Sequence, residues 1–275
     1  MEDLTSPDLE IIARQIRGTI IKVSHASHTP HLGSSLSCVD ILVAAYWGVL
    51  AIDPENSEAP DRDRLILSKG HAAPALYTTL AYRGFFPKEL LDTYAQPGSR
   101  LEEHPTPYCV PGVEAATGSL GHGLSLGLGM AIAGRIQGYS YRVIVIMSDG
   151  ECNEGSVWEA AMFAPIHRLN NIVTIVDFNR WQATGRSCDV MALMPLRQKW
   201  EAFGWNVHEV DGHDIHALVD VLSDVRDGNE KPVAIIAHTV KGKGVSFMED
   251  DNNWHYRVPN ADEVKAAHGE LGVRS

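Results

Sequence analysis

The hydrophobic pattern of the chain is clearest between residues 141 and 182, where two almost continuous apolar runs enclose a helical pattern. The runs Val143–Met147 and Ile172–Val176 have no polar face, which is typical of strands buried on both faces of a parallel sheet. Between them, Gly155–Arg168 has the spacing of a helix. This strand–helix–strand order predicts a crossover between two parallel strands, around which the rest of the chain is organised.

Similar patterns predict further elements on both sides of this crossover. Helices are expected at Asp8–Ser24, Val39–Leu50, Pro87–Tyr94, Met194–Phe203, residues 213–225 and Ala261–Leu271, and one more follows the glycine-rich turn after Ala115. Short strands are expected before Gly70, at Asn206–Val210 and at Pro232–Ala237. Buried strands alternating with helices predict an α/β fold of three layers, with a mostly parallel central sheet between two layers of helices.

Length, charge and cysteine content narrow the organisation and the partners. With 275 residues, 44% of them apolar, and no repeat or linker, we expect one domain over residues 1–275. The formal charge of −12 and the lack of a basic stripe argue against nucleic acid or an anionic membrane. No apolar run approaches the roughly eighteen residues of a membrane span, and the amino terminus lacks an apolar signal region. The scattered cysteines indicate free thiols in a reducing cytoplasm; they are Cys38, Cys109, Cys152 and Cys188.

Oxygen-bearing side chains follow both strands of the central crossover. Asp149 comes after the first strand, and Asn179 comes thirty residues later, after the second. Ligands of open α/β sheets bind outside the carboxyl ends of the strands, so these side chains should converge. Either residue alone is most simply a turn residue, but the pair, with Gly150 and Glu154 nearby, favours a site. A carboxylate, an amide oxygen and a backbone carbonyl suit Mg²⁺, which completes its shell with phosphate oxygens.

Several other stretches of the sequence are compatible with either a binding role or a purely structural one. Gly33-Ser34-Ser35 precedes the apolar helix expected at Val39–Leu50, whose first N–H groups are able to face an anion. Three histidines crowd the loop before it, without a carboxylate or thiol to complete a metal site; they are His25, His28 and His31. Lys241-Gly242-Lys243-Gly244 is either a phosphate-attracting loop or a solvated turn. His208, His213 and His216 are expected on the surface.

Six motifs, in order between about Asp8 and Pro259, resemble those of transketolases. They include HLGSSLS, DRDRLILSKGHA, TGSLGHG, the pair of SDG with the later asparagine, and TVKGKG. The SDG pair is similar to the metal–diphosphate motif of thiamine diphosphate enzymes. The chain departs from the family pattern at Leu32, Glu103 and Ser148, where the family has proline, glycine and glycine.

The resemblance implies a role for individual residues of this chain. It implies acid–base work by His31, His104 and His255, with Glu154 as a carboxylate near the cofactor and the subunit interface. Contacts with thiamine diphosphate are implied for His71, Gly118, Ser119, Leu120, Asp149, Gly150, Glu151, Asn179 and His255. The implied Mg²⁺ ligands, which would also accept Ca²⁺ or Mn²⁺, are Asp149, Asn179 and the backbone carbonyl of Trp181.

The function implied by the resemblance is transketolase activity, the transfer of a two-carbon ketol unit from a ketose or ketose phosphate to an aldose or aldose phosphate. We expect several histidines to titrate near neutral pH for this chemistry. In the family, a separate pyrimidine-binding domain completes the cofactor site. We therefore expect the partner to be a carboxy-terminal transketolase subunit, in a heterotetramer with two copies of each chain.

Two alternatives remain at this stage. The α-subunit of a 2-oxoacid dehydrogenase shares the metal motif, but the histidine set and the TGSLGHG and TVKGKG runs favour transketolase. A non-catalytic cofactor-binding or regulatory subunit is disfavoured by the intact Asp149, Asn179 and His31. The sequence does not identify the donor and acceptor sugars.

Overall fold

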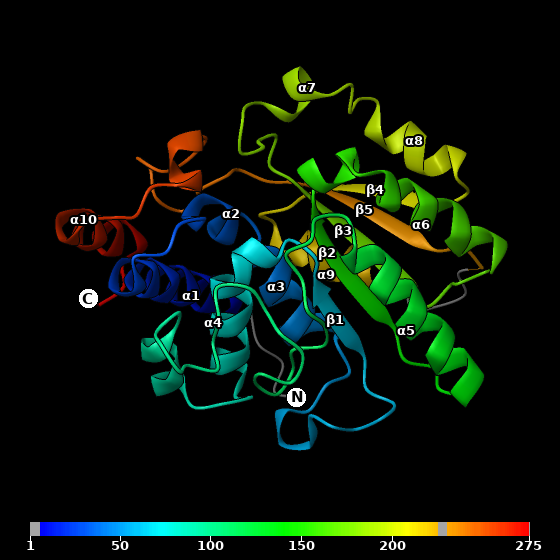
Figure 1. The fold of residues 1–275 in the computed structure, drawn as a ribbon, viewed down its shortest axis with the longest axis horizontal. Helices are drawn as coiled ribbons and strands as arrows, with labels where there is room; N and C mark the ends of the chain where they lie inside the picture. Colours follow the sequence, from blue (N-terminus) through cyan, green and yellow to red (C-terminus); the bar gives the residue numbers. More distant parts are fainter. Residues whose placement is uncertain (1–5, 225–229, 275) are drawn as a thin grey trace.

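A sheet of five parallel strands forms the centre of the chain in this computed structural model, which describes residues 6–224 and 230–274 (Figure 1). The strands are β1 Arg64–Leu67, β2 Val143–Ser148, β3 Ile172–Phe178, β4 Asn206–Asp211 and β5 Val233–His238. Their order in the sheet is β1-β2-β3-β5-β4, and all of these pairings are parallel. The prediction of a parallel sheet built around the β2–β3 crossover is confirmed.

Helices surround the sheet and connect its strands. The α-helices are α1 Ser6–Ser27, α2 Leu32–Ser37, α3 Val39–Val43, α4 Ala73–Arg83, α5 Gly123–Gln137, α6 Gly155–Ile166, α7 Ser187–Val190, α8 Leu196–Ala202, α9 Ile215–Asp224 and α10 Ala261–Leu271. The 3-10 turns are η2 Pro54–Asn56, η3 Gly70–Ala72, η4 Lys88–Thr93, η5 Gly150–Asn153 and η6 Asn252–His255, and η1 Ala44–Val49 is a π-helical segment. The last residue of the helix expected over 213–225 lies outside the described residues.

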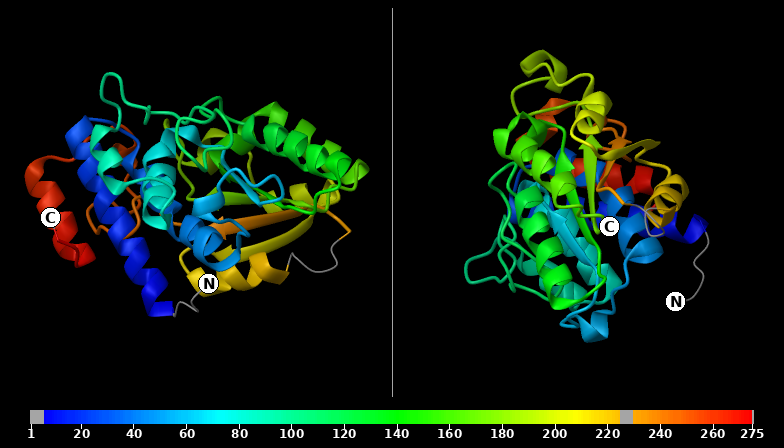
Figure 2. Two further views of the ribbon diagram at one scale, coloured as in Figure 1. Left: turned by 90° about the horizontal axis from the view of Figure 1, so that it is seen from below. Right: turned by 90° about the vertical axis from the view of Figure 1, so that its right-hand side faces the viewer.

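The inner strands β2, β3 and β5 bury both of their faces, which produces two apolar cores. Along β2, Ile144 and Ile146 belong to one core, with residues of α1, α3, α4 and α9. Val143, Val145 and Met147 belong to the other, with residues of α5, α6 and α8. Side chains that alternate along a strand point to opposite faces, so both faces need a helical layer. Figure 2 shows these layers on the two sides of the sheet, and the predicted three-layer α/β architecture is confirmed.

The chain around α2 differs from the sequence prediction. Gly33, Ser34 and Ser35, expected before the start of a helix, lie inside α2, because the chain already turns at His31, whose φ is 69°. The helix expected over Val39–Leu50 is α-helical only to Val43 and continues as a π-helical segment. There, the Leu50 N–H donates to the carbonyl of Ala45, five residues back.

Within the described part of the chain, no helix is both long and apolar enough to cross a membrane. The cysteines Cys38, Cys109, Cys152 and Cys188 are free thiols, as predicted.

Candidate active site

Asp149 and Asn179 meet at the carboxyl edge of the sheet. They follow β2 and β3, which pair with each other as far as Ser148 and Asp177. The backbone N–H of Arg180 donates to Oδ2 of Asp149 over 3.0 Å and so joins the two strand ends directly. The expected convergence of the two strand ends is confirmed, and it follows from the parallel arrangement of the strands.

Three histidines from distant parts of the chain gather at the same edge. His31 precedes α2, His71 lies in η3 after β1, and His255 ends η6. The ring centroids of His31 lie 5.2 Å from His71 and 5.0 Å from His255, and those of His71 and His255 are 5.8 Å apart. The His31 backbone N–H donates to the His255 carbonyl over 2.9 Å. Segments near the beginning and near the end of the chain therefore meet here. We call His31, His71 and His255 the histidine cluster.

Burial lowers the pKa of all three imidazoles in the cluster. The pKa of His31 falls to about 4, through burial first and then repulsion by His104 and Lys241. Burial and then Lys241 lower the pKa of His255 to about 3, and the pKa of His71 lies well below its usual value, again mainly through burial. The cluster is therefore neutral at pH 7. The expectation that His31 and His255 titrate near neutral pH is wrong for this chain, because desolvation and nearby cations both oppose the imidazolium form.

Lys241 places a buried cation beside the cluster. Only 1% of this residue is exposed. Its Nζ donates to Asn252 Oδ1 over 2.7 Å and to Nδ1 of His255 over 3.1 Å. Because an ammonium group only donates, Nδ1 of His255 is the acceptor and the ring proton is on Nε2. Burial, followed by repulsion from Lys69, lowers the pKa of Lys241 to about 8, so it remains mostly charged at pH 7.

A second buried cation, Lys69, forms an ion pair that the sequence reasoning missed. The side chains of Lys69 and Asp177 are in contact and are both fully buried. The Asp177 carboxylate also accepts hydrogen bonds from Ser37 over 2.6 Å, from the Asn179 amide over 3.3 Å and from the Thr239 hydroxyl. Burial opposes the charge on Asp177, but Lys69 outweighs it and lowers the pKa of the carboxyl. Asp177 therefore ties together segments that follow β1, β3 and β5.

Glu151 anchors the glycine-rich turn that precedes α5. Its carboxylate is fully buried. It accepts hydrogen bonds from Ser68 Oγ over 2.5 Å, from the Gly121 N–H over 3.0 Å and from the Ser148 N–H over 2.9 Å. These donors belong to the chain itself, so the carboxylate joins the ends of β1 and β2 to the turn and acts as a positioning group.

The glycine-rich turn, residues 117–123, passes close to the end of β1 and to His104. A Cβ on Gly70 would lie 2.4 Å from the backbone carbon of Thr117, so the chain after β1 tolerates only glycine there. Gly118 has a φ of 133°, and a Cβ on it would lie 2.6 Å from the His104 ring. His104 and Glu154 are both exposed beside this turn, and Ser119, Leu120 and His122 are exposed within it.

Nearly the whole chain matches a family of known proteins. Residues 10–275 match the family described as "Transketolase, thiamine diphosphate binding domain". The chain belongs to the transketolase family.

Curated transketolase relatives align with it over almost their full length. It is 41% identical to an apulose-4-phosphate transketolase subunit from Phocaeicola vulgatus, covering 97% of this chain and 94% of the relative. The protein of the same name from Actinobacillus succinogenes is 43% identical over 98% of each chain. A 6-deoxy-6-sulfo-D-fructose transketolase subunit from a Clostridium species is 40% identical over 96% of each.

Solved transketolases share the fold but are longer. The structure of transketolase from Campylobacter jejuni has a TM-score of 0.91 and 26% identity, covering 98% of this chain and 43% of that one. The Leishmania mexicana enzyme also has a TM-score of 0.91 and 26% identity, covering 96% and 41%. The chain therefore spans about two fifths of the length of these solved transketolases.

The oxygen atoms at the strand ends fit the divalent cation that transketolase-type sites imply. The fully buried Asp149 carboxylate accepts hydrogen bonds from Gly150 N–H and Arg180 N–H, each over 3.0 Å, and from Ser187 Oγ over 2.7 Å. Burial nevertheless raises its pKa to about 7. A bound cation would stabilise the charged form of such a carboxylate, because it supplies the compensating charge that burial removes.

The other candidate metal ligands are also oxygen atoms, which suits a hard cation. Asn179 Oδ1 accepts the Trp181 backbone N–H over 3.1 Å, which holds the Trp181 backbone next to the amide. Among the residues that the structure describes, no group of three or more His, Cys, Asp or Glu side chains is arranged to hold a metal ion. A cation here would rely on Asp149, on Asn179, on the Trp181 carbonyl and on phosphate oxygens, the pattern preferred by Mg²⁺.

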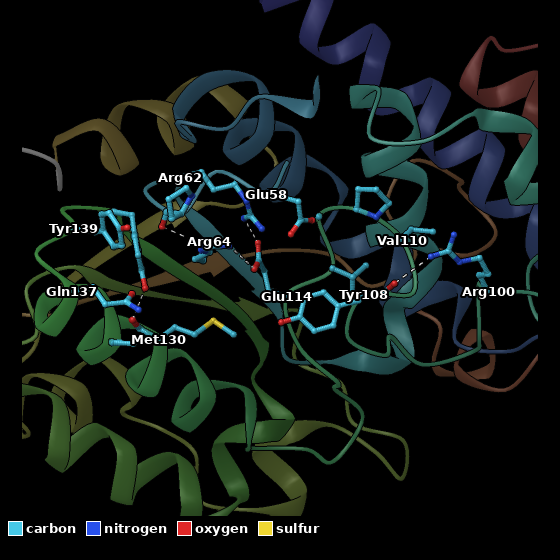
Figure 3. Close-up of a pocket in the computed structure, with 16 residues that line it drawn as sticks. Glu58, Arg62, Arg64, Arg100, Tyr108, Val110, Glu114, Met130, Gln137 and Tyr139 are labelled. Atoms are coloured by element: carbon cyan, nitrogen blue, oxygen red, sulfur yellow. Dashed lines mark hydrogen bonds and ion pairs between the residues drawn. The ribbon is translucent and has the colours of Figure 1, made fainter. Parts of the chain in front are cut away.

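A separate cavity of about 600 Å³ lies beside the amino end of β1 (Figure 3). Figure 3 shows Arg62 and Arg64 directed toward Glu114, with which both form ion pairs. The same guanidinium groups also donate to the carbonyls of Ser57, Asp63 and Pro60. These charges are already engaged by the chain, so we assign the arginines a structural role rather than ligand binding.

The neutral histidine cluster predicts a loss of stability in acid. The folded pKa of His255, about 3, lies below the usual value of about 6.5. The unfolded chain therefore binds more protons, and the stability present above pH 6.5 is lost as the pH falls. Between pH 7 and pH 5 the share of His255 is about 1 kcal/mol, after allowance for its partial exposure. Urea unfolding at both pH values should show a smaller acid loss for His255→Gln than for the unsubstituted chain. An equal loss in both, with His208→Gln as control, would contradict this assignment.

Proposed function

We propose that this chain is the thiamine diphosphate- and Mg²⁺-binding subunit of a two-chain transketolase. In this assembly it transfers a two-carbon ketol unit from a ketose or ketose phosphate to an aldose or aldose phosphate. The observation that carries the proposal is the meeting, at one sheet edge, of the histidine cluster and Lys241 with the oxygen atoms of Asp149 and Asn179. The histidine cluster and Lys241 suit an anion, and the oxygen atoms of Asp149 and Asn179 suit a cation. A diphosphate with a bound metal ion requires both.

The chain's own residues divide the work at this edge. Lys241 and His71 would hold the diphosphate, because they combine a buried positive charge with a neutral imidazole that can donate a hydrogen bond. Asp149, Asn179 and the carbonyl of Trp181 would hold Mg²⁺, for which Ca²⁺ or Mn²⁺ would substitute. Gly118, Ser119, Leu120 and Gly150 would line the approach to the cofactor, and Glu151 fixes the turn that carries the first three.

Proton transfer falls to the neutral histidines. The bound cofactor would supply a nucleophilic carbon and an electron sink for cleaving the bond beside a ketose carbonyl. His31 can accept a proton from a sugar hydroxyl because its imidazole is neutral at pH 7. His255 presents an Nε2–H donor, because its Nδ1 is engaged by Lys241. The exposed His104 and Glu154 would face substrate and the neighbouring subunit.

An exposed apolar surface supports the requirement for a partner chain. The helices α5 and α6 lie side by side in Figures 1 and 2, and both carry large apolar side chains that are exposed. They are Leu126, Ile136, Met162, Phe163 and Ile166, the most exposed being Ile136 at 81%. A cavity of about 350 Å³ lies between the two helices. Exposed apolar side chains gathered on two neighbouring helices are typical of an interaction site.

The comparisons support the same division into two chains. The relatives that this chain covers over 94–98% of their length are named as transketolase subunits. We propose that the partner is a carboxy-terminal, pyrimidine-binding transketolase subunit, in a heterotetramer with two copies of each chain. The free thiols, three of them buried, support a cytoplasmic location. The names of the relatives refer to apulose 4-phosphate and 6-deoxy-6-sulfo-fructose, so the substrate class proposed here is a modified sugar or its phosphate.

Reconstitution tests the proposed function directly. The chain alone, saturated with Mg²⁺ and thiamine diphosphate, is expected to show no ketol transfer, since it provides only one side of the cofactor site. Addition of a carboxy-terminal transketolase subunit from the same genome should produce turnover and a complex with the mass of a heterotetramer. Full turnover by the chain alone would refute the two-chain proposal. Turnover of a 2-oxoacid instead of a ketose would favour the dehydrogenase alternative. Cofactor binding without any turnover in the assembled complex would favour a regulatory subunit.

A further inference from the structure

A hydrogen-bonded relay connects α1 to the loop that carries Lys241. Arg17 donates to the two carboxylate oxygens of Asp40 over 2.9 and 2.6 Å. Nδ1 of His213 lies 2.7 Å from Oδ2 of Asp40, and Nε2 of His213 lies 2.8 Å from the backbone nitrogen of Val240. The side chain of His213 is only 12% exposed. The expectation that His213 is a surface residue is therefore wrong, because its ring is inserted between α3 and the loop after β5.

The ionisation of Asp40 determines which ring nitrogen of His213 carries the proton. Burial opposes the charge on Asp40, but Arg17 and the hydrogen bond from His213 outweigh it and lower its pKa to about 2. A carboxylate only accepts, so Nδ1 of His213 donates to it. The Val240 N–H only donates, so Nε2 of His213 accepts from it. The relay therefore requires a neutral His213 with its proton on Nδ1, an arrangement that leaves both partners satisfied.

Gly212, the residue before His213, allows His213 to lie close to the loop that follows β5. The N–H of Gly212 donates to the carbonyl of His238, the last residue of β5, over 2.8 Å. A Cβ on Gly212 would lie 2.4 Å from Cγ2 of Thr239, so only glycine permits this approach. The turn after β4 is thereby pressed against the end of β5, and the ring of His213 reaches the next peptide, at Val240.

The loop after β5 is held on both sides of Lys241. On the carboxyl side, the Gly242 N–H donates to the Gly33 carbonyl over 3.0 Å, and the Lys241 carbonyl accepts the Asp250 N–H over 2.8 Å. On the amino side, the hydrogen bond from the Val240 N–H to His213 joins the residue directly before Lys241 to α3 and α1. This bond is therefore one of the contacts that hold the backbone of Lys241, and with it the ammonium beside His255.

We propose that His213, held by Asp40 and Arg17, is a positioning residue that fixes Lys241 for binding of the cofactor diphosphate. The proposal rests on the proposed function for the role of Lys241, but the relay itself concerns residues of this chain alone. Loss of the Nε2 acceptor releases the Val240 peptide, so that Lys241 becomes more accessible and holds the diphosphate less well.

Three substitutions at position 213 separate the two hydrogen bonds. His213→Leu removes both of them. His213→Lys retains a donor for Asp40 but offers no acceptor to the Val240 N–H. His213→Gln supplies an amide N–H and an amide oxygen, and is expected to restore both. His208→Leu, on β4 and outside the relay, is the matched control. If His213→Leu does not fold, the Lys and Gln variants still decide between positioning and bulk packing.

The first measurement needs no cofactor. The rate at which acetic anhydride modifies Lys241, followed by mass spectrometry of the folded chain, should rise several-fold in His213→Leu and His213→Lys. It should stay near the unsubstituted rate in His213→Gln and His208→Leu. Equal labelling of Lys241 in all variants would overturn the proposal, whether or not the chain binds thiamine diphosphate.

The second measurement uses the assembled two-chain enzyme with Mg²⁺. His213→Lys should weaken cofactor binding about ten-fold, the effect of one well-made hydrogen bond. In a Lys241→Ala background the same substitution should add almost nothing, because the group that it positions has been removed. Independent, multiplying effects of the two substitutions would overturn the proposal. Absence of cofactor binding by the unsubstituted enzyme would instead refute the proposed function, while the labelling rates still decide on the relay.

Discussion

Replacement of Asp149 by alanine is expected to abolish Mg²⁺-dependent binding of thiamine diphosphate while the chain stays folded. Asp149 supplies the carboxylate of the proposed cation site, and its oxygens also hold the ends of β2 and β3 together through the Arg180 N–H. Loss of this hydrogen bond costs about 1–3 kcal/mol. Removal of a buried carboxylate whose pKa is raised to about 7 offsets part of that cost. The fold should therefore survive and only the site should fail.

Thermal unfolding of the reconstituted complex measures this effect. At a cofactor concentration of about 100 Kd, the unsubstituted protein should gain roughly 2.7 kcal/mol of stability, and Asp149→Ala should gain none. Asp189→Ala is the control, because Asp189 is an exposed carboxylate on α7. A similar ligand-induced rise in melting temperature for Asp149→Ala would show that the metal site lies elsewhere.

The largest effect on stability is expected from Lys69→Met. This substitution leaves Asp177 as a fully buried carboxylate without its cation. Breaking a buried pair in this way costs about 3–5 kcal/mol, far more than loss of an exposed pair. The exposed pair of Lys243 and Glu249 gives the comparison, since Lys243→Met should cost at most about 1 kcal/mol.

Urea unfolding of the two variants tests this contrast, and a double variant identifies the cause. Adding Asp177→Asn to Lys69→Met removes the unpaired charge. Ser37 and Thr239 donate to different oxygens of Asp177, so the Asn oxygen can still accept from one hydroxyl and the Asn amide can donate to the oxygen of the other. Stability should therefore recover in part. If the double variant is as unstable as Lys69→Met, lost packing rather than the unpaired charge accounts for the effect.

Much of the sheet and of its ligand edge could be predicted from the sequence. Apolar runs such as Val143–Met147 identify strands because a strand buried on both faces has no polar positions. Once two such strands are parallel, the residues that follow them must meet at one edge, which is why the sequence places Asp149 and Asn179 together. These inferences use only local patterns and the geometry of parallel sheets.

The buried polar groups could not be predicted in this way. Lys69 and His213 look like ordinary turn residues in the sequence, and their burial depends on contacts with Asp177 and Asp40, far away along the chain. The pKa values of the cluster histidines likewise depend on burial, which composition does not show. The signal that would have helped is glycine: Gly70 and Gly212 each precede a histidine, and each marks a close approach of two segments.

The contact between His31 and His255 sets an order of events during synthesis of the chain. The backbone N–H of His31 donates to the carbonyl of His255. This hydrogen bond can form only after the second residue, near the end of the chain, has been synthesised. At about 5–20 residues per second, roughly tens of seconds separate the synthesis of the two. A nascent chain therefore emerges before its histidine cluster is complete. Binding of thiamine diphosphate can stabilise the folded chain only after the segment that carries Lys241 and His255 has left the ribosome.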